Sequence, residues 1–143
     1  APFVKLLSDR CMQKANSEGV IRTKLGRKCR FDMWEPKDFG VHTPEKFENA
    51  SAKYGSSNIK RAFTYKALNR LIQGSAADQT KAAIVACHEN GFTPLLQIHD
   101  ELCFNLQDKS QIEKIKTVME GCMKLKVPSV VDVAVGDDFG MAT

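Results

Sequence analysis

Three neighbouring residues, His99, Asp100 and Glu101, can exchange protons or bind metal ions through their side chains. They lie between the apolar segments 95–98 and 102–106. The alternation of apolar residues in the second segment predicts a strand, which places the three residues at a hairpin tip. Carboxylates held there repel each other unless a cation compensates. Magnesium prefers such oxygen ligands, and two-metal phosphoryl transfer needs carboxylates on a rigid scaffold. The residues alone also fit the simpler interpretation, an ordinary polar turn.

A second group of polar residues repeats every four positions: Arg61, Tyr65, Asn69 and Gln73, with Lys66 and Arg70 alongside. On a helix, this spacing predicts one polar stripe. Asparagine and glutamine amides can donate to the acceptors that every base pair presents in the DNA minor groove. The alternative is a solvated helix face without a ligand.

The elements that would position these groups suggest an α+β fold. The pattern predicts an antiparallel β-sheet packed with helices, including one long helix. Gly74 and Ser75 inside that long helix are interpreted as small residues for close packing. The predicted elements are a helix over 2–18, a hairpin of 20–23 and 28–31, a long loop over 32–56 with a turn of helix near 44–49, the long helix over 57–90, the hairpin around 99–101, a helix opened by a capping box at Ser110 and Glu113, and a strand over 129–135.

Composition and charge limit the classes of function. The 143 residues carry 43% hydrophobic and 27% charged residues, a globular balance without a membrane-spanning run. Residues 1–70 hold 15 Lys and Arg against 7 Asp and Glu, whereas residues 71–143 hold 6 against 10. This asymmetry fits a surface for a polyanion and another for cations, or else a solvated basic surface. Five scattered cysteines without a C-x-x-C pair predict reduced, buried thiols in a cytoplasmic protein.

Four ordered segments carry a family resemblance. They are 23–28 (TKLGRK), 71–78 (LIQGSAAD), 95–102 (LLQIHDEL) and the closing residues 127–139. Together they resemble the C-terminal part of family A, polymerase I-like DNA polymerases, with 95–102 similar to motif C of the palm and 61–78 similar to phage members. Tyr65 departs from the family, where arginine is common. The resemblance implies that 1–19 is the helix leaving the fingers and 20–143 the C-terminal part of the palm, with 32–56 as an insertion.

The resemblance also implies roles for particular residues in template-directed nucleotidyl transfer by two-metal catalysis. It implies Asp100 as the ligand of two Mg²⁺ ions and Glu101 as a secondary carboxylate. The implied partners are primer–template DNA and a dNTP. The residues implied to contact the DNA are His99, Gln97, Gln73, Asn69, Lys66, Arg61, Arg27 and Lys28.

The resemblance also implies two features that these 143 residues lack. They are the motif A aspartate and the fingers helix that binds the incoming nucleotide. We therefore expect the isolated chain not to extend primers, because one main carboxylate is missing. The expected partner is the remainder of the polymerase, in cis or in trans, in a bacterial or phage-infected cell. The alternatives are the small subunit of a naturally split polymerase and a non-catalytic nucleic-acid-binding module. Apolar surface left uncovered would favour self-association.

Overall fold

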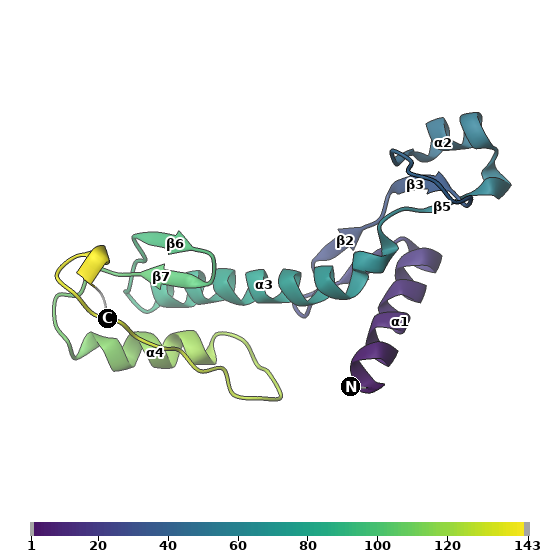
Figure 1. Ribbon diagram of the computed structural model, residues 1–143. Coiled ribbons are helices and arrows are strands. Elements are labelled where there is room, and N and C mark those ends of the chain that lie inside the picture. Colours follow the sequence, from purple (N-terminus) through teal and green to yellow (C-terminus); the bar gives the residue numbers. More distant parts are fainter. Residues whose placement is uncertain (1, 142–143) are drawn as a thin grey trace. The chain divides into compact units, whose positions relative to one another are not determined.

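The computed structural model describes residues 2–141 and divides the chain into two compact units, Ala1–Ser75 (unit 1) and Ala76–Thr143 (unit 2) (Figure 1). Each unit combines helices with short antiparallel strands, and one helix of 23 residues continues from unit 1 into unit 2. The predicted α+β class is confirmed. Within the described part of the chain, the strands form three small antiparallel sheets rather than one continuous sheet. Within residues 2–141, no helix has the length and apolar character needed to cross a membrane.

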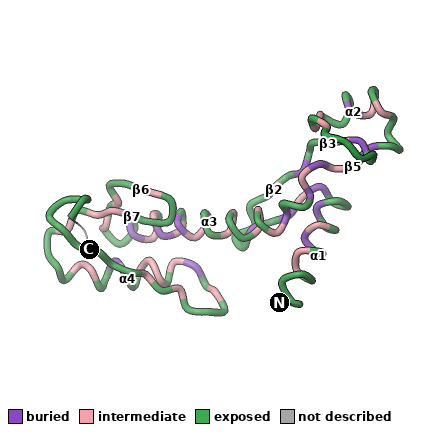
Figure 2. The backbone as a smooth tube through the Cα atoms, viewed as in Figure 1, coloured by how far each residue is buried: buried purple, intermediate pink, exposed green. Residues whose placement is uncertain are grey.

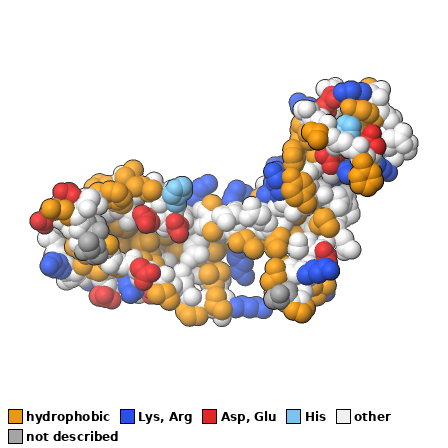
Figure 3. Space-filling model, viewed as in Figure 1, with side chains coloured by type: hydrophobic (Ala, Val, Ile, Leu, Met, Phe, Trp, Pro, Cys, Tyr) orange, Lys and Arg blue, Asp and Glu red, His pale blue; other side chains and the backbone are white. Residues whose placement is uncertain are grey.

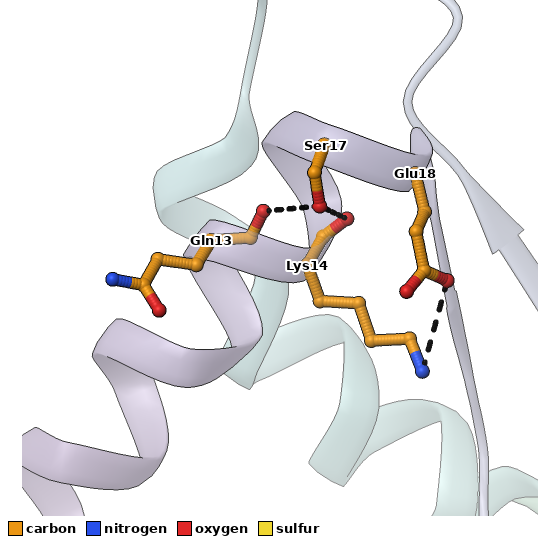
Figure 4. A network of polar contacts seen from close by, with 4 residues as sticks. All are labelled: Gln13, Lys14, Ser17 and Glu18. Carbon is orange, nitrogen blue, oxygen red and sulfur yellow. Dashed lines mark hydrogen bonds and ion pairs between the residues drawn. The ribbon is translucent and has the colours of Figure 1, made fainter.

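Unit 1 begins with helix α1 (Pro2–Glu18), as predicted. Pro2 suits a first helical turn because its missing N–H would have no partner there. On the exposed side of α1, the Ser17 hydroxyl donates to the Gln13 carbonyl at 3.0 Å and Lys14 pairs with Glu18 at 3.7 Å (Figure 4). These contacts are solvent-exposed and contribute little to stability.

The hairpin of β1 (Val20–Arg22) and β2 (Lys28–Arg30) follows, also as predicted. Its turn needs Gly26, whose φ is +87°. The Arg27 amide donates to the Thr23 hydroxyl at 3.0 Å, which fixes the turn from inside. A core of Cys11, Ala15, Ile21, Phe31 and Ala67 forms where α1, this hairpin and the first residue of helix α3 (Ala67–Glu89) meet (Figure 2).

The loop predicted over 32–56 is wrong, because much of this segment is ordered secondary structure. It contains β3 (Met33–Pro36), β4 (Glu45–Lys46) and α2 (Phe47–Tyr54), followed by a short 3-10 helix η1 (Ser56–Asn58) and β5 (Ile59–Arg61). The three strands pair antiparallel in the order β4-β3-β5. Strands this short depend on partners distant in sequence, which local propensity does not reveal.

The long helix α3 (Ala67–Glu89) begins ten residues later than the predicted position 57. Residues 59–61 pair with β3 instead, and the 3-10 helix η2 (Thr64–Lys66) precedes α3. Phe63 has a φ of 60°, a left-handed conformation that interrupts any helix. The predicted end is confirmed, since Gly91 has a φ of 83° and the Phe92 amide closes on the Cys87 carbonyl.

Unit 2 contains the hairpin β6 (Leu96–Ile98) and β7 (Glu101–Cys103), then α4 (Gln111–Gly121). The hairpin is confirmed, but the predicted capping box is wrong. The Ser110 side chain does not cap α4 and donates to Asp108 at 2.9 Å instead, because Ser110 already has helical backbone angles.

The strand predicted over 129–135 is also wrong. Residues 122–138 carry no helix or strand, and only a short 3-10 helix, η3 (Phe139–Met141), follows. This segment is fixed by side chains instead: the Gln79 amide donates to Ser129 at 2.7 Å, and Glu120 accepts from the Val131 amide at 2.9 Å. Alternating valines need a neighbouring strand to form a ladder, and the described residues offer none.

Candidate nucleic-acid interface and catalytic turn

The β1–β2 hairpin is fastened to the N-terminal half of α3 by backbone contacts at Gly74 and Ser75. The Arg27 guanidinium donates to the Gly74 carbonyl at 2.8 Å, and the Lys24 amide donates to the Ser75 hydroxyl at 3.0 Å. A Cβ atom at position 74 would lie 2.8 Å from the Thr23 methyl. The interpretation of these small residues as a close-packing site is therefore confirmed.

Exposed polar groups surround this junction. Asn69 and Gln73 are exposed and lie one turn apart on α3, and neither side chain hydrogen-bonds to residues 2–141. Lys28 is exposed on β2. Because Arg27 binds Gly74, the hairpin brings its basic side chains beside the helix turn that carries Gln73. Figure 3 shows Lys and Arg side chains gathered around β2 and the start of α3.

Arg70, which the sequence placed beside the polar stripe, supports the hairpin from α3. Its guanidinium donates to the Arg30 carbonyl at 3.1 Å and lies 4.7 Å from the centre of the Phe31 ring. A planar cation can make both contacts at once. Arg70 therefore contributes to positioning the hairpin.

The predicted helical stripe is wrong at its N-terminal end, because Arg61 lies on β5 and Tyr65 and Lys66 lie in η2. The Arg61 guanidinium donates to the carbonyls of Phe31 at 2.9 Å and Asn16 at 3.3 Å. It also lies 4.6 Å from the centre of the Trp34 ring. Arg61 therefore links α1, the end of β2 and β3.

Lys66 is exposed, and its ammonium lies near two aromatic rings. The distances to the ring centres are 5.1 Å for Phe63 and 5.6 Å for Tyr65. Tyr65 itself is 67% exposed. Cation–π attraction restricts the long lysine side chain without neutralising its charge.

In unit 2, the predicted carboxylates lie at the tip of the β6–β7 hairpin, with Asp100 in the two-residue turn and Glu101 as the first residue of β7. Ile98 pairs with Glu101, so His99 and Asp100 form the turn itself. His99 has a φ of 53°, whereas Asp100 has no positive φ. The Gln97 side-chain amide donates to the His99 carbonyl at 3.0 Å. Four side chains of this segment are exposed: Gln97, His99, Asp100 and Glu101. Figure 3 shows histidine and acidic side chains together at this end of the hairpin.

The donor atoms at this turn suit a hard divalent cation. Asp100 and Glu101 supply carboxylate oxygens, the ligand type that Mg²⁺ prefers. Within residues 2–141, no group of three or more His, Cys, Asp and Glu side chains is arranged to hold a metal. The described residues therefore bring two carboxylates together at this tip and no third ligand.

The five cysteines are free thiols, and two of them, Cys11 and Cys87, are buried. Burial raises the pKa of Cys11, Cys87 and Cys122, which favours the protonated thiol. The predicted burial is confirmed for Cys11 and Cys87, whereas Cys29, Cys103 and Cys122 are half-buried.

Unit 1 thus carries a basic hairpin hydrogen-bonded to a helix with exposed amides, and unit 2 carries a hairpin tip with two carboxylates. The sequence profile of DNA polymerase family A matches residues 2–141. The chain therefore belongs to DNA polymerase family A.

Individual relatives agree with this assignment. The chain is 40% identical over 139 residues to a DNA-directed DNA polymerase of Pseudomonas phage M6, covering 97% of this chain and 18% of that protein. It is 38% identical over 146 residues to the thermostable DNA polymerase I of Thermus aquaticus, covering 96% of this chain and 15% of that protein. The chain thus spans less than a fifth of the length of these relatives.

A solved structure is also similar, the polymerase domain of Pol1 from M. smegmatis in complex with DNA primer-template and dNTP. The TM-score is 0.60 at 27% sequence identity, covering 87% of this chain and 20% of that chain.

Sequence reasoning missed two features of the site. The contact between the Gln97 amide and the His99 carbonyl has no sequence signature, because glutamine is common on exposed strands. Thr23 was not singled out either, although its buried methyl meets α3 and its hydroxyl fixes the hairpin turn. A threonine three residues before a turn glycine is the only signal that the sequence offered for it.

Proposed function

We propose that this chain is the C-terminal part of the palm of a DNA-directed DNA polymerase and that Asp100 binds the catalytic metal ions. The observation that carries the proposal is the turn itself. An exposed aspartate sits on a two-residue hairpin whose first residue has a left-handed backbone. A non-glycine residue in this conformation costs of order 1 kcal/mol, and such residues cluster at active sites. Membership of DNA polymerase family A supports the same role.

The reaction we propose is attack of a primer 3′-hydroxyl oxygen on the α-phosphorus of an incoming dNTP. The new bond joins that oxygen to the α-phosphorus, the bond from the α-phosphorus to the oxygen bridging to the β-phosphate breaks so that pyrophosphate leaves, and the hydroxyl proton is released to solvent. When bound, two Mg²⁺ ions supply activation of the hydroxyl and stabilisation of the charge that develops on the phosphate. Asp100 would hold the metals through its carboxylate, and Glu101 would add negative charge beside it. The exposed His99 is placed next to Asp100 on the turn, which suits a contact with the primer terminus.

Unit 1 would bind the primer–template duplex. Asn69 and Gln73 present free amides from one face of α3, which suits the shared minor-groove acceptors of all base pairs. Arg27 and Lys28 on the clamped hairpin would lie along the phosphate backbone, and Lys66 would add a third cation. Arg61 uses its donors inside the protein, so we expect it to contribute mainly through folding.

The chain on its own would bind DNA without extending a primer, because the second main carboxylate would come from another segment of the polymerase. Apolar side chains left exposed on unit 2 are consistent with such a missing neighbour: Leu95, Leu96, Val127 and Val130 are 70%, 52%, 68% and 72% exposed. Covering them would favour association in cis or in trans. The same exposed surface keeps a split-polymerase subunit as a second candidate.

The test is primer extension by the polymerase that contains this chain, carrying Asp100→Asn. This change removes the carboxylate and keeps the side-chain shape, so extension should fall by about 1,000-fold or more, the scale of losing an essential group. Asp132→Asn is the matched control, because Asp132 is exposed in unit 2 outside the turn. Unchanged extension with Asp100→Asn would contradict the metal-ligand role and favour a binding module without catalysis.

A further inference from the structure

The Gln97 side chain turns back onto the hairpin tip instead of extending away from it. Its amide nitrogen donates to the His99 carbonyl at 3.0 Å, two residues further along the chain. A carbonyl oxygen only accepts hydrogen bonds, so the amide nitrogen must face the turn and the amide oxygen must face away. The contact joins β6 to the peptide group between His99 and Asp100.

That peptide group sets the direction in which Asp100 points. His99 and Asp100 are the two central residues of the turn, and His99 has a φ of 53°. Two-residue hairpins favour glycine, asparagine or aspartate at positions of positive φ, because a side chain there meets the backbone. A histidine in this conformation needs support from its surroundings, and the hydrogen bond from Gln97 provides it.

We propose that Gln97 is a positioning residue for Asp100: its amide fixes the His99–Asp100 peptide plane and thereby the orientation of the metal-binding carboxylate. This inference rests on the proposed role of Asp100. It goes beyond the expectation that Gln97 contacts the primer strand, because one of the two N–H donors of the Gln97 amide is already used inside the protein.

The experiment uses the polymerase that contains this chain and measures primer extension as a function of Mg²⁺ concentration, together with the Kd for primer–template DNA. Gln97→Met removes the donor and keeps the length of the side chain. Gln107→Met is the matched control, because Gln107 is an exposed glutamine of the same unit whose side chain has no hydrogen bond with residues 2–141. Gln97→Lys keeps a donor within reach of the His99 carbonyl.

Loss of one such hydrogen bond corresponds to about a fivefold change in an equilibrium. We therefore expect Gln97→Met to raise the Mg²⁺ concentration at half-maximal rate about fivefold and to leave the Kd for DNA unchanged. Gln107→Met should change neither quantity, and Gln97→Lys should restore the Mg²⁺ midpoint to within about twofold of the original.

Two results would overturn the positioning role. A raised Kd for DNA with an unchanged Mg²⁺ midpoint would make Gln97 a DNA contact, and a response equal to that of Gln107→Met would make the hydrogen bond inconsequential. If Gln97→Met does not fold, failure of Gln97→Lys to keep the Mg²⁺ midpoint would refute the inference. Asp100→Asn is assayed in parallel: active Asp100→Asn would refute the proposed function itself, whereas inactive Asp100→Asn with a silent Gln97→Met refutes only the role of Gln97.

Discussion

Replacing Gly74 by alanine should loosen the contact between the β1–β2 hairpin and α3. The new Cβ would lie 2.8 Å from the Thr23 Cγ2 methyl and 3.4 Å from the Arg27 guanidinium. The guanidinium is the end of a flexible side chain and can move. The methyl belongs to a buried, β-branched residue that is only 5% exposed, so the hairpin itself must shift.

Two opposing contributions decide the magnitude. Alanine is favoured over glycine inside a helix by about 1 kcal/mol. Overpacking costs about 1–3 kcal/mol, and a displaced hairpin also weakens two hydrogen bonds worth about 1 kcal/mol each, from Arg27 to Gly74 and from Lys24 to Ser75. The penalty is the larger contribution, and we expect a net loss of about 1–2 kcal/mol in the free energy of unfolding.

Urea denaturation of the chain measures this loss, and amide hydrogen exchange of residues 20–30 reports whether the hairpin is the part that loosens. Gly121→Ala is the matched control. Gly121 is the last residue of α4, and a Cβ there would meet nothing within 4 Å. Gly121→Ala should therefore leave stability unchanged or raise it by about 0.5 kcal/mol.

Thr23→Ser provides the decisive second step, because it removes the clashing methyl and keeps the hydroxyl that accepts from the Arg27 amide. Alone it should cost about 0.5–1 kcal/mol through the lost methyl. In the Gly74→Ala background, Thr23→Ser should instead raise the free energy of unfolding by about 1 kcal/mol. The effect of Thr23→Ser thus changes sign between the two backgrounds, which is expected only if residues 23 and 74 are in direct contact. Additive effects, or a Gly74→Ala chain as stable as Gly121→Ala, would refute the close-packing argument.

Two other predictions concern the framework of each unit. Arg61→Met should lower the free energy of unfolding by about 2 kcal/mol, because it removes two hydrogen bonds to backbone carbonyls and a stacked ring contact. The control Lys14→Met breaks only an exposed ion pair and should lower it by less than about 0.5 kcal/mol. Equal losses in the two variants would contradict the linking role of Arg61. The Ser110 amide and hydroxyl lower the pKa of Asp108, so their stabilisation is present above the unfolded-state pKa of Asp108 and is lost as the pH falls through the lower folded-state pKa. Ser110→Ala should raise the pKa of Asp108 in an NMR titration, and an unchanged titration would rule out the hydroxyl as a cause.

Local sequence patterns were sufficient for the elements whose reasons are local. Helical spacing of apolar residues with Pro2 at the start and Gly19 at the end defined α1. Asn90 and Gly91 correctly marked the end of α3, and two apolar runs around His99 and Asp100 defined the β6–β7 hairpin. In each case the signal lies within a few residues, since helix ends and tight turns depend on nearby side chains and backbone angles.

The four-residue spacing of the polar stripe was misleading at its first two members. Arg61 and Tyr65 fit the period, yet the left-handed backbone of Phe63 ends any helical path between residue 61 and α3. Periodicity describes which residues would share a face if a helix formed. Periodicity does not show whether a segment pairs with a strand instead of forming a helix. Arg61 lies in such a segment, because it pairs with Trp34 of β3.

The sequence by itself determined the family, the class of fold and the positions of the carboxylates at a turn, because motif order and turn chemistry are written in consecutive residues. Only the tertiary structure decided which polar groups are free and which are used internally. It bound Arg61 to backbone carbonyls, brought Gly74 against Thr23 and turned Gln97 toward the His99 carbonyl. These contacts depend on the three-dimensional approach of separate segments and on side-chain direction, which spacing along the chain does not specify.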